Sequence, residues 1–81
     1  MKIKIELFSV YREAIGEKEI EIEIKDDAKI KDIIQFLTKK YPSIRKFIGY
    51  AIFSINHEYA DENRSVKEGD EIAIFPPIGG G

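Results

Sequence analysis

One stretch of this chain has helical periodicity, and the stretches on both sides of it alternate like strands. Apolar residues recur at helical spacing over residues 29–41. Charged and apolar residues alternate strictly over 2–8 and 19–25, and the alternation returns over 50–56 and 71–75. A single amphipathic helix buries its apolar stripe by packing on a sheet, so the pattern predicts an α+β fold with the helix on one face.

Turn and capping residues indicate where these elements end. A short helical turn that ends at Gly16 is expected between the first two strands, which makes them a hairpin with an elaborated loop. Asp26 or Asp27 is expected to cap the long helix, and Pro42 to stop it, because the residue before a proline resists the helical conformation. A further short strand is expected over 57–60, after a turn.

Size and composition exclude several classes of protein. The chain has 81 residues, so we expect one domain with little room for a deep enclosed pocket. Its net charge is -2 and it has no basic stripe, which argues against a nucleic-acid partner. No segment approaches the roughly 20 apolar residues that span a membrane. The N-terminus also lacks a signal-peptide pattern, so no membrane partner is expected and the default location is cytoplasmic.

The sequence contains no evident active site of the ordinary kind. The single histidine, His57, lies in a predicted turn, where a solvated side chain is the simpler interpretation. One histidine and no cysteine leave no metal site of the zinc type and no obvious pair of nucleophile and base. Three glutamates, Glu19, Glu21 and Glu23, lie on one face of a predicted strand, and solvation is again the simpler explanation.

The C-terminal residues are the clearest candidate for chemistry. Residues 79–81 are glycines, and Pro76 and Pro77 precede them. The prolines stiffen the exit from the last strand, so we expect a folded domain over 1–77 and a flexible glycine tail over 78–81. Because glycine has no Cβ, such a tail can enter a narrow channel in another protein and present its carboxylate there.

Strand parity places three aromatic side chains away from the face that the helix covers. Phe8 lies on the charged face of the first strand, Phe75 lies opposite the apolar face of the last strand, and Tyr59 can join them from the short strand. If the first and last strands are neighbours, the rings form one exposed apolar patch beside the tail, and such a patch usually marks a protein interface. The alternative is that a curled sheet or a loop buries one ring.

The sequence resembles a known family. Residues 69–81 contain a Gly-Asp-Glu turn, a strand, Phe-Pro-Pro, an aliphatic residue and a final Gly-Gly, which together resemble the signature of the molybdopterin synthase small-subunit (MoaD) family of sulfur carriers. Residues 7–16 are similar to the family's first strand and Arg-Glu helical turn, and residues 55–59 to its small hairpin. Gly79 departs from the pattern, because the family often has Ser or Thr at that position.

The resemblance implies a fold and an assembly. The fold is the ubiquitin-like β-grasp, a mixed sheet of four to five strands whose first and last strands are adjacent and parallel, with one main helix packed on one face. The assembly is heterotetrameric molybdopterin synthase. This chain would be its non-catalytic sulfur carrier, and the catalytic side chains would belong to the large subunit.

The resemblance also implies a sequence of reactions at the C-terminus. An adenylyltransferase similar to ubiquitin-activating enzymes uses ATP to convert the Gly81 carboxylate to an acyl-adenylate. A sulfur donor enzyme then displaces AMP and leaves a thiocarboxylate, whose sulfur passes to cyclic pyranopterin monophosphate. The chain itself would bind no cofactor and no metal. In this scheme Gly81 is the acceptor and Gly80 the narrow approach to it. The residues expected to bind partners are Phe8, Tyr59, Phe75, Pro76, Pro77, Ile78 and Gly79.

Three other functions are compatible with the same sequence. Archaeal ubiquitin-like small modifiers resemble this family closely and would join Gly81 to lysines of target proteins. The thiamin-pathway sulfur carrier is also a β-grasp protein that ends in Gly-Gly, but the Phe-Pro-Pro segment and the chain length of 81 residues argue against it. A purely structural interaction module would have an inert tail.

Overall fold

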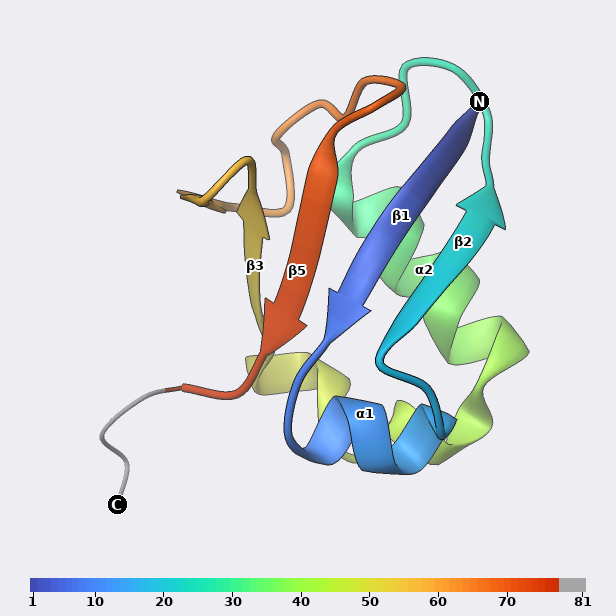
Figure 1. Ribbon diagram of the computed structural model, residues 1–81, viewed down its shortest axis with the longest axis vertical. Helices are drawn as coiled ribbons and strands as arrows, with labels where there is room; N and C mark the ends of the chain where they lie inside the picture. The colour runs from blue at the N-terminus through green and yellow to red at the C-terminus, as the bar shows by residue number, and fades with distance from the viewer. Residues whose placement is uncertain (78–81) are drawn as a thin grey trace.

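The computed structural model describes residues 1–77, and the predicted glycine tail over 78–81 lies outside the described residues. Within these residues one sheet of five strands, in the order β2-β1-β5-β3-β4, packs against helix α2 (Figure 1). The strands are β1 (Lys2–Leu7), β2 (Glu19–Glu23), β3 (Ile52–Ile55), β4 (Glu58–Ala60) and β5 (Glu71–Phe75). The helices are α1 (Val10–Ile15), α2 (Ile30–Lys40) and the two 3₁₀ turns η1 (Pro42–Ile44) and η2 (Ile48–Tyr50).

The sheet is mixed, and β1 and β5, which both lie inside it, are parallel. Strands β1 and β5 pair in register, with Lys4 opposite Glu71 and Leu7 opposite Ile74. The other neighbouring strands in the sheet are antiparallel. The predicted mixed sheet with adjacent, parallel first and last strands is therefore confirmed.

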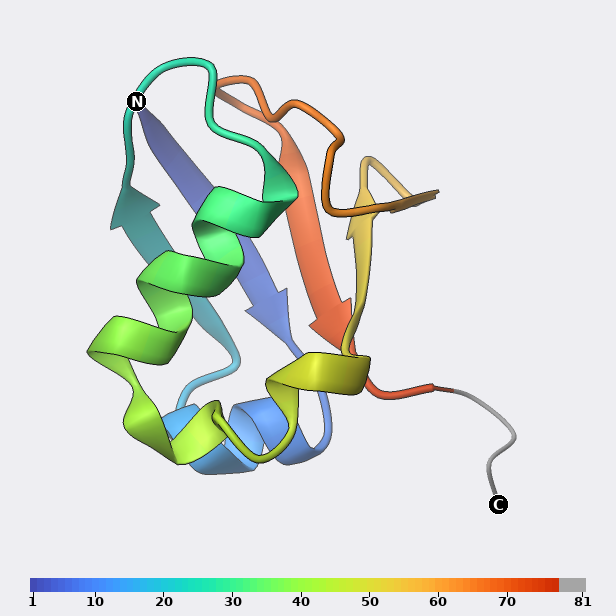
Figure 2. The ribbon, with the colours of Figure 1, turned by 180° about the vertical axis from the view of Figure 1, so that it is seen from behind.

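One face of the sheet is covered by α2, and the other face is open. The alternation predicted for β1 is present in the structure. Ile3, Ile5 and Leu7 are buried, whereas Lys2, Lys4 and Glu6 are exposed. Figure 2 shows α2 crossing the sheet on the side from which Ile33 and Leu37 complete the core. At roughly 1.5–3 kcal/mol for each fully buried aliphatic side chain, this layer is the main stabilising element of the fold.

Helix α2 begins later than its predicted cap, so the expectation that Asp26 or Asp27 caps it was wrong. The helix begins at Ile30, and its first turn is capped by Asp32, whose Oδ2 accepts a 2.8 Å hydrogen bond from the backbone N–H of Lys29. The physical reason is long-range pairing that keeps the backbone before the helix extended. Residues 28–30 exchange backbone hydrogen bonds with residues 64–66, including an isolated bridge from Lys29 to Ser65.

The predicted third strand also starts later than expected. The alternation suggested a strand from residue 50, but Ile48–Tyr50 forms the turn η2, and the Ala51 N–H closes it on the Ile48 carbonyl at 3.2 Å. Strand β3 therefore begins at Ile52. The helical turn α1 does end at Gly16 as predicted, with a positive φ of 89° that an L-residue adopts only at a cost.

Candidate functional site

Three aromatic side chains meet on the open face of the sheet. Phe8 directly follows β1 and Phe75 ends β5, and their rings lie 6.4 Å apart in a T-shaped arrangement. The ring of Tyr59, from β4, lies 6.3 Å from that of Phe75 on its other side. The geometry expected from strand parity is thus confirmed, because none of the three rings belongs to the buried core.

Strand pairing holds the three rings in place. The Phe8 N–H donates a 3.2 Å hydrogen bond to the Ile74 carbonyl, which extends the β1–β5 ladder and fixes Phe8 beside Phe75. In β3, Ser54 lies opposite Tyr59 of β4 on one side and opposite Ala73 of β5 on the other. Two small side chains therefore lie between large ones, and they leave the surface hollow.

The hollow is an open groove of about 650 Å³. The residues that line this groove, called the aromatic groove below, are Glu6, Phe8, Ser54, His57, Tyr59, Ala73, Phe75, Pro76 and Pro77. The side chains of Phe8 and Tyr59 are 43% and 72% exposed, which is unusual for large apolar rings that stand side by side. An exposed aromatic cluster with a hollow centre has the composition of a protein docking site.

Two titratable side chains, His57 and Glu6, stand at the rim of the aromatic groove. His57 lies in the turn of the β3–β4 hairpin, and its Nε2 is 3.4 Å from Oε2 of Glu71. Both side chains are largely exposed, so this contact contributes little to stability. On another side of the groove Glu6 lies across from Ala73 and has no partner of opposite charge in β5.

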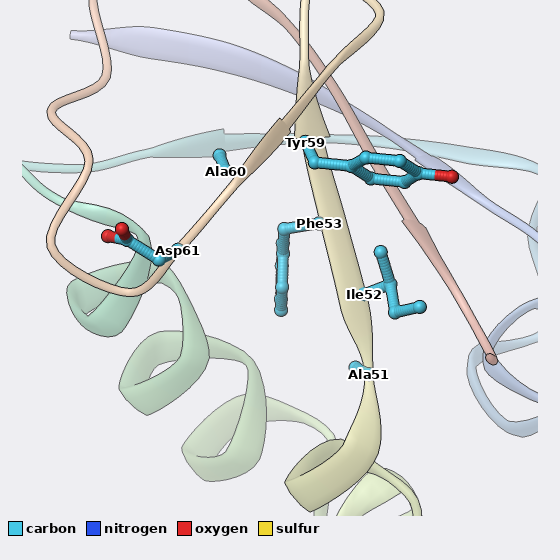
Figure 3. A pocket seen from close by; sticks show the side chains of 6 residues that line it. All are labelled: Ala51, Ile52, Phe53, Tyr59, Ala60 and Asp61. Carbon is cyan, nitrogen blue, oxygen red and sulfur yellow. The ribbon is translucent and has the colours of Figure 1, made fainter.

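Tyr59 also borders a second hollow, on the outer side of β3. This pocket has a volume of about 420 Å³ and is lined by Ala51, Ile52, Phe53, Tyr59, Ala60 and Asp61. Figure 3 shows Tyr59 and Ile52 on one side of β3 and Phe53 on the other, as the alternation of a strand requires. The ring of Tyr59 therefore separates the outer pocket from the aromatic groove.

The structure brings together five of the predicted site residues. Phe8, Tyr59, Phe75, Pro76 and Pro77 all line the aromatic groove. Their role in binding partners remains a prediction. The remaining predicted residues, Ile78, Gly79, Gly80 and Gly81, lie outside the described residues.

Sequence reasoning missed four residues of the groove. Glu6, Ser54, His57 and Ala73 line it but were not proposed as site residues. Strand parity could have placed Glu6 and Ala73 on the open face. It could not show that small side chains would lie between the rings, because that depends on the register between strands.

Two further kinds of site are absent from residues 1–77. No group of three His, Cys, Asp or Glu side chains is arranged to hold a metal ion there. No helix in that part of the chain is both long enough and apolar enough to cross a membrane.

The parallel β1–β5 pair, the single long helix and the open aromatic face define a ubiquitin-like β-grasp protein. The chain belongs to the ThiS family, whose model matches residues 5–81. Curated relatives bear out the resemblance. The molybdopterin synthase sulfur carrier subunit of Chlamydomonas reinhardtii is 32% identical over 100% of both chains. That of Dictyostelium discoideum is 34% identical, with 99% of this chain and 96% of the relative covered.

Other relatives carry a different name. Small archaeal modifier protein 3 of Haloferax volcanii is 25% identical over 100% of both chains. Among solved structures, a putative molybdopterin converting factor subunit 1 from Pyrococcus furiosus superposes with a TM-score of 0.87 at 26% identity, covering 96% of this chain and 99% of that one. A complex of subunits 1 and 2 of molybdopterin-converting factor from Helicobacter pylori has also been solved. Its matching chain superposes with a TM-score of 0.72 at 22% identity, covering 100% of both chains.

Proposed function

We propose that this chain is the sulfur carrier of molybdopterin synthase and that the carboxyl group of Gly81 carries the sulfur. The full-length similarity to curated sulfur carrier subunits supports the proposal. The observation that carries it is the position of the aromatic groove. Pro76 and Pro77 line the groove, and the segment that leads to Gly81 follows Pro77 directly in the chain.

The proposed chemistry activates a carboxylate that is otherwise a poor electrophile. A ubiquitin-activating-enzyme-like adenylyltransferase transfers AMP from ATP to Gly81 and releases pyrophosphate. A sulfur donor enzyme then supplies sulfur at the sulfide oxidation level, which attacks the carbonyl carbon; the bond from this carbon to the AMP oxygen breaks, AMP leaves, and a thiocarboxylate remains. The chain has no cysteine, so the sulfur would travel on this carbon and not on a thiol. ATP would be bound by the activating partner.

The reach of the C-terminal segment sets a geometric requirement for the partner. Four residues, Ile78 to Gly81, span at most about 13 Å when extended. A protein that covers the aromatic groove and receives Gly81 must therefore have its reactive site within about that distance of Pro77. The Helicobacter pylori complex of subunits 1 and 2 supports the large synthase subunit as this partner. The large subunit would supply the catalytic side chains and transfer the sulfur to cyclic pyranopterin monophosphate in a heterotetrameric synthase.

Deletion of Gly81 tests the proposal. The buried core ends at Ile74, so we expect the shortened chain to unfold at the same temperature as the full chain. In a reconstituted synthase it should transfer no sulfur. Gly79→Ser is the matched control, because it changes the same segment but keeps the last two residues, and it should remain active. Full activity of the Gly81 deletion would refute the proposal.

Mass analysis of the protein from its native cells gives an independent test. A thiocarboxylate replaces one oxygen by one sulfur, and the corresponding mass increase should map to Gly81. An unmodified C-terminus under conditions of active molybdopterin synthesis would contradict the proposal.

A second function is supported by the Haloferax volcanii relatives, which are named as small archaeal modifier proteins. In this case Gly81 would be joined to lysine side chains of other proteins. Lysine-linked adducts in cell extracts, lost on deletion of Gly81, would establish this function. The two functions share the activated carboxyl group and differ in the nucleophile that attacks it.

A further inference from the structure

The open face of the sheet has a charged half beside the aromatic groove. In the paired strands β1 and β2, Lys2 lies opposite Glu23 and Lys4 lies opposite Glu21. Lys4 also lies opposite Glu71 on its other side, in β5. Opposite charges across neighbouring strands stabilise a sheet, so these positions are complementary within the chain itself.

One cross-strand position breaks this pattern. Glu6 of β1 lies directly opposite Glu19 of β2. The Leu7 N–H donates to the Lys18 carbonyl and the Ile24 N–H donates to the Met1 carbonyl, so the odd-numbered residues of β1 lie in hydrogen-bonded pairs. The two kinds of pair alternate along an antiparallel ladder, so the even-numbered residues lie in the other kind. Glu6 and Glu19 therefore form a non-hydrogen-bonded pair, the kind in which side chains lie closer together.

Within residues 1–77, no lysine or arginine lies directly opposite either of these two carboxylates in the sheet. Neither glutamate forms an ion pair within residues 1–77. The β5 neighbour of Glu6 is Ala73, and Lys4, on the same face of β1, lies directly opposite two other glutamates, Glu21 and Glu71. Like charges directly opposite each other destabilise a sheet, so the fold retains a pair that it would be more stable without.

The pair adjoins the aromatic groove. Glu6 lines the groove together with Phe8, which lies two residues further along the chain, directly after β1. We propose that Glu6 and Glu19 receive a lysine or arginine side chain of the protein that docks in the aromatic groove. This inference rests on the proposed function and adds a chemical requirement for the partner: an apolar centre with a cation on the side that covers β1 and β2.

The charges at the other rim of the groove indicate on which side of the partner this cation must lie. There Glu71 lies opposite Lys4 across the β1–β5 ladder, and its Oε2 is 3.4 Å from Nε2 of His57. The two carboxylates with no lysine directly opposite, Glu6 and Glu19, therefore lie on the β2 side of the groove. A charge pair that forms beside the apolar contact would select the right partner in the right orientation and speed its association. The apolar contact alone does not select an orientation.

The experiment compares two variants with a matched control. Glu6→Gln and Glu19→Gln each remove one charge from the pair and keep the size of the side chain. Glu21→Gln makes the same change on the same strand and face, but its partner is Lys4 and it does not line the groove. Each protein is tested for its dissociation constant with the large subunit of molybdopterin synthase, at low and high salt, and for its unfolding midpoint in urea.

Stability and binding should change independently in the two variants of the glutamate pair. Glu6→Gln and Glu19→Gln should unfold at equal or higher urea concentration than the unmodified chain. Their dissociation constants should rise roughly five- to tenfold at low salt, with a weaker dependence on salt. Glu21→Gln should bind as the unmodified chain does and unfold at equal or lower urea concentration.

The outcomes that would overturn the inference are distinct. If the unmodified chain binds the large subunit and both pair variants bind equally well, the pair is only a solvated part of the sheet. If a pair variant loses stability and affinity together, the carboxylates support the fold and do not receive a partner's cation. If the unmodified chain does not bind the large subunit at all, the proposed function fails and the inference falls with it.

Discussion

The hydroxyl of Tyr11 donates a 2.6 Å hydrogen bond to the backbone carbonyl of Phe47. Tyr11 belongs to α1 and is fully buried, whereas Phe47 lies in the connection between η1 and η2. A second bond, from Ser43 Oγ to the Ala14 carbonyl at 2.9 Å, joins η1 to α1. These bonds fix the connection that leads into β3, the strand that lies opposite the end of β5.

Removal of the Tyr11 hydroxyl should lower stability without affecting docking. In Tyr11→Phe the Phe47 carbonyl loses its donor in a partly buried position, so we expect the free energy of unfolding to fall by about 1–2 kcal/mol. Urea denaturation measures this change. Tyr50→Phe, at a tyrosine that is 52% exposed, is the control and should have no effect. Equal stability of all three proteins would show that the hydrogen bond is dispensable.

The same residue predicts a loss of stability at alkaline pH. Burial, with a smaller contribution from Tyr50, raises the pKa of Tyr11 from 10.0 to about 12. Because the native pKa is above the unfolded one, this contribution is fully present below pH 10.0 and is lost as the pH rises through about 12. The stability difference between the unmodified chain and Tyr11→Phe should therefore shrink over this interval. A constant difference would contradict the prediction.

The hairpin turn between β3 and β4 gives a prediction about backbone conformation. Asn56 has a φ of 52°, its Oδ1 accepts a 2.9 Å hydrogen bond from the Glu71 N–H, and its Nδ2 donates a 3.1 Å bond to Asp70. Asn56→Gly and Asn56→Ala both remove the side-chain bonds, but the alanine keeps a Cβ in the left-handed region and the glycine does not. The alanine variant should be less stable than the glycine variant by roughly 1 kcal/mol. Urea midpoints in the reverse order would contradict this explanation.

The first turn of α2 predicts a dependence on acid. The hydrogen bond from the Lys29 N–H holds the pKa of Asp32 below its ordinary value, and nearby lysines act in the same direction. A lowered native pKa means that the stabilisation is present above the unfolded pKa and is lost as the pH falls through the native one. Asp32→Asn should be less stable near neutral pH, and the difference should vanish in acid. Asp27→Asn, at an exposed position outside the cap, should behave like the unmodified chain.

A charge placed in the aromatic groove should prevent docking. Phe75 lies between the rings of Phe8 and Tyr59, so Phe75→Arg should weaken binding of the large synthase subunit by about 2 kcal/mol or more, as for a central anchor. Gln35→Arg introduces the same charge on the exposed side of α2, and its dissociation constant should not change. An unaltered dissociation constant for Phe75→Arg, measured by titration calorimetry, would exclude the groove as the docking site.

Local pattern was sufficient for the elements and their inward faces. The alternation of Ile3, Ile5 and Leu7 identified the buried side of β1 and the outward position of Phe8, because strand parity depends only on neighbouring residues. It did not identify which strands pair, since every strand alternates in the same way. The parallel pairing of β1 with β5 came from the family resemblance.

Long-range contacts account for what local pattern could not predict. Asp26 and Asp27 were expected to cap α2, but the backbone at Lys29 is held extended by its bridge to Ser65, which no local signal reveals. The hollow of the aromatic groove has the same origin. It exists because Ser54 lies opposite Ala73, and that match depends on the register of two strands far apart in sequence.

Among residues 1–77, β5 is the last strand in the chain and yet lies inside the sheet, between β1 and β3. Until the ribosome has released this segment, β1 has no neighbour on that side, and Phe8 and Tyr59 lack the ring that separates them. A nascent or truncated chain therefore presents no complete groove. A partner that recognises the groove would therefore engage only chains whose synthesis has passed β5.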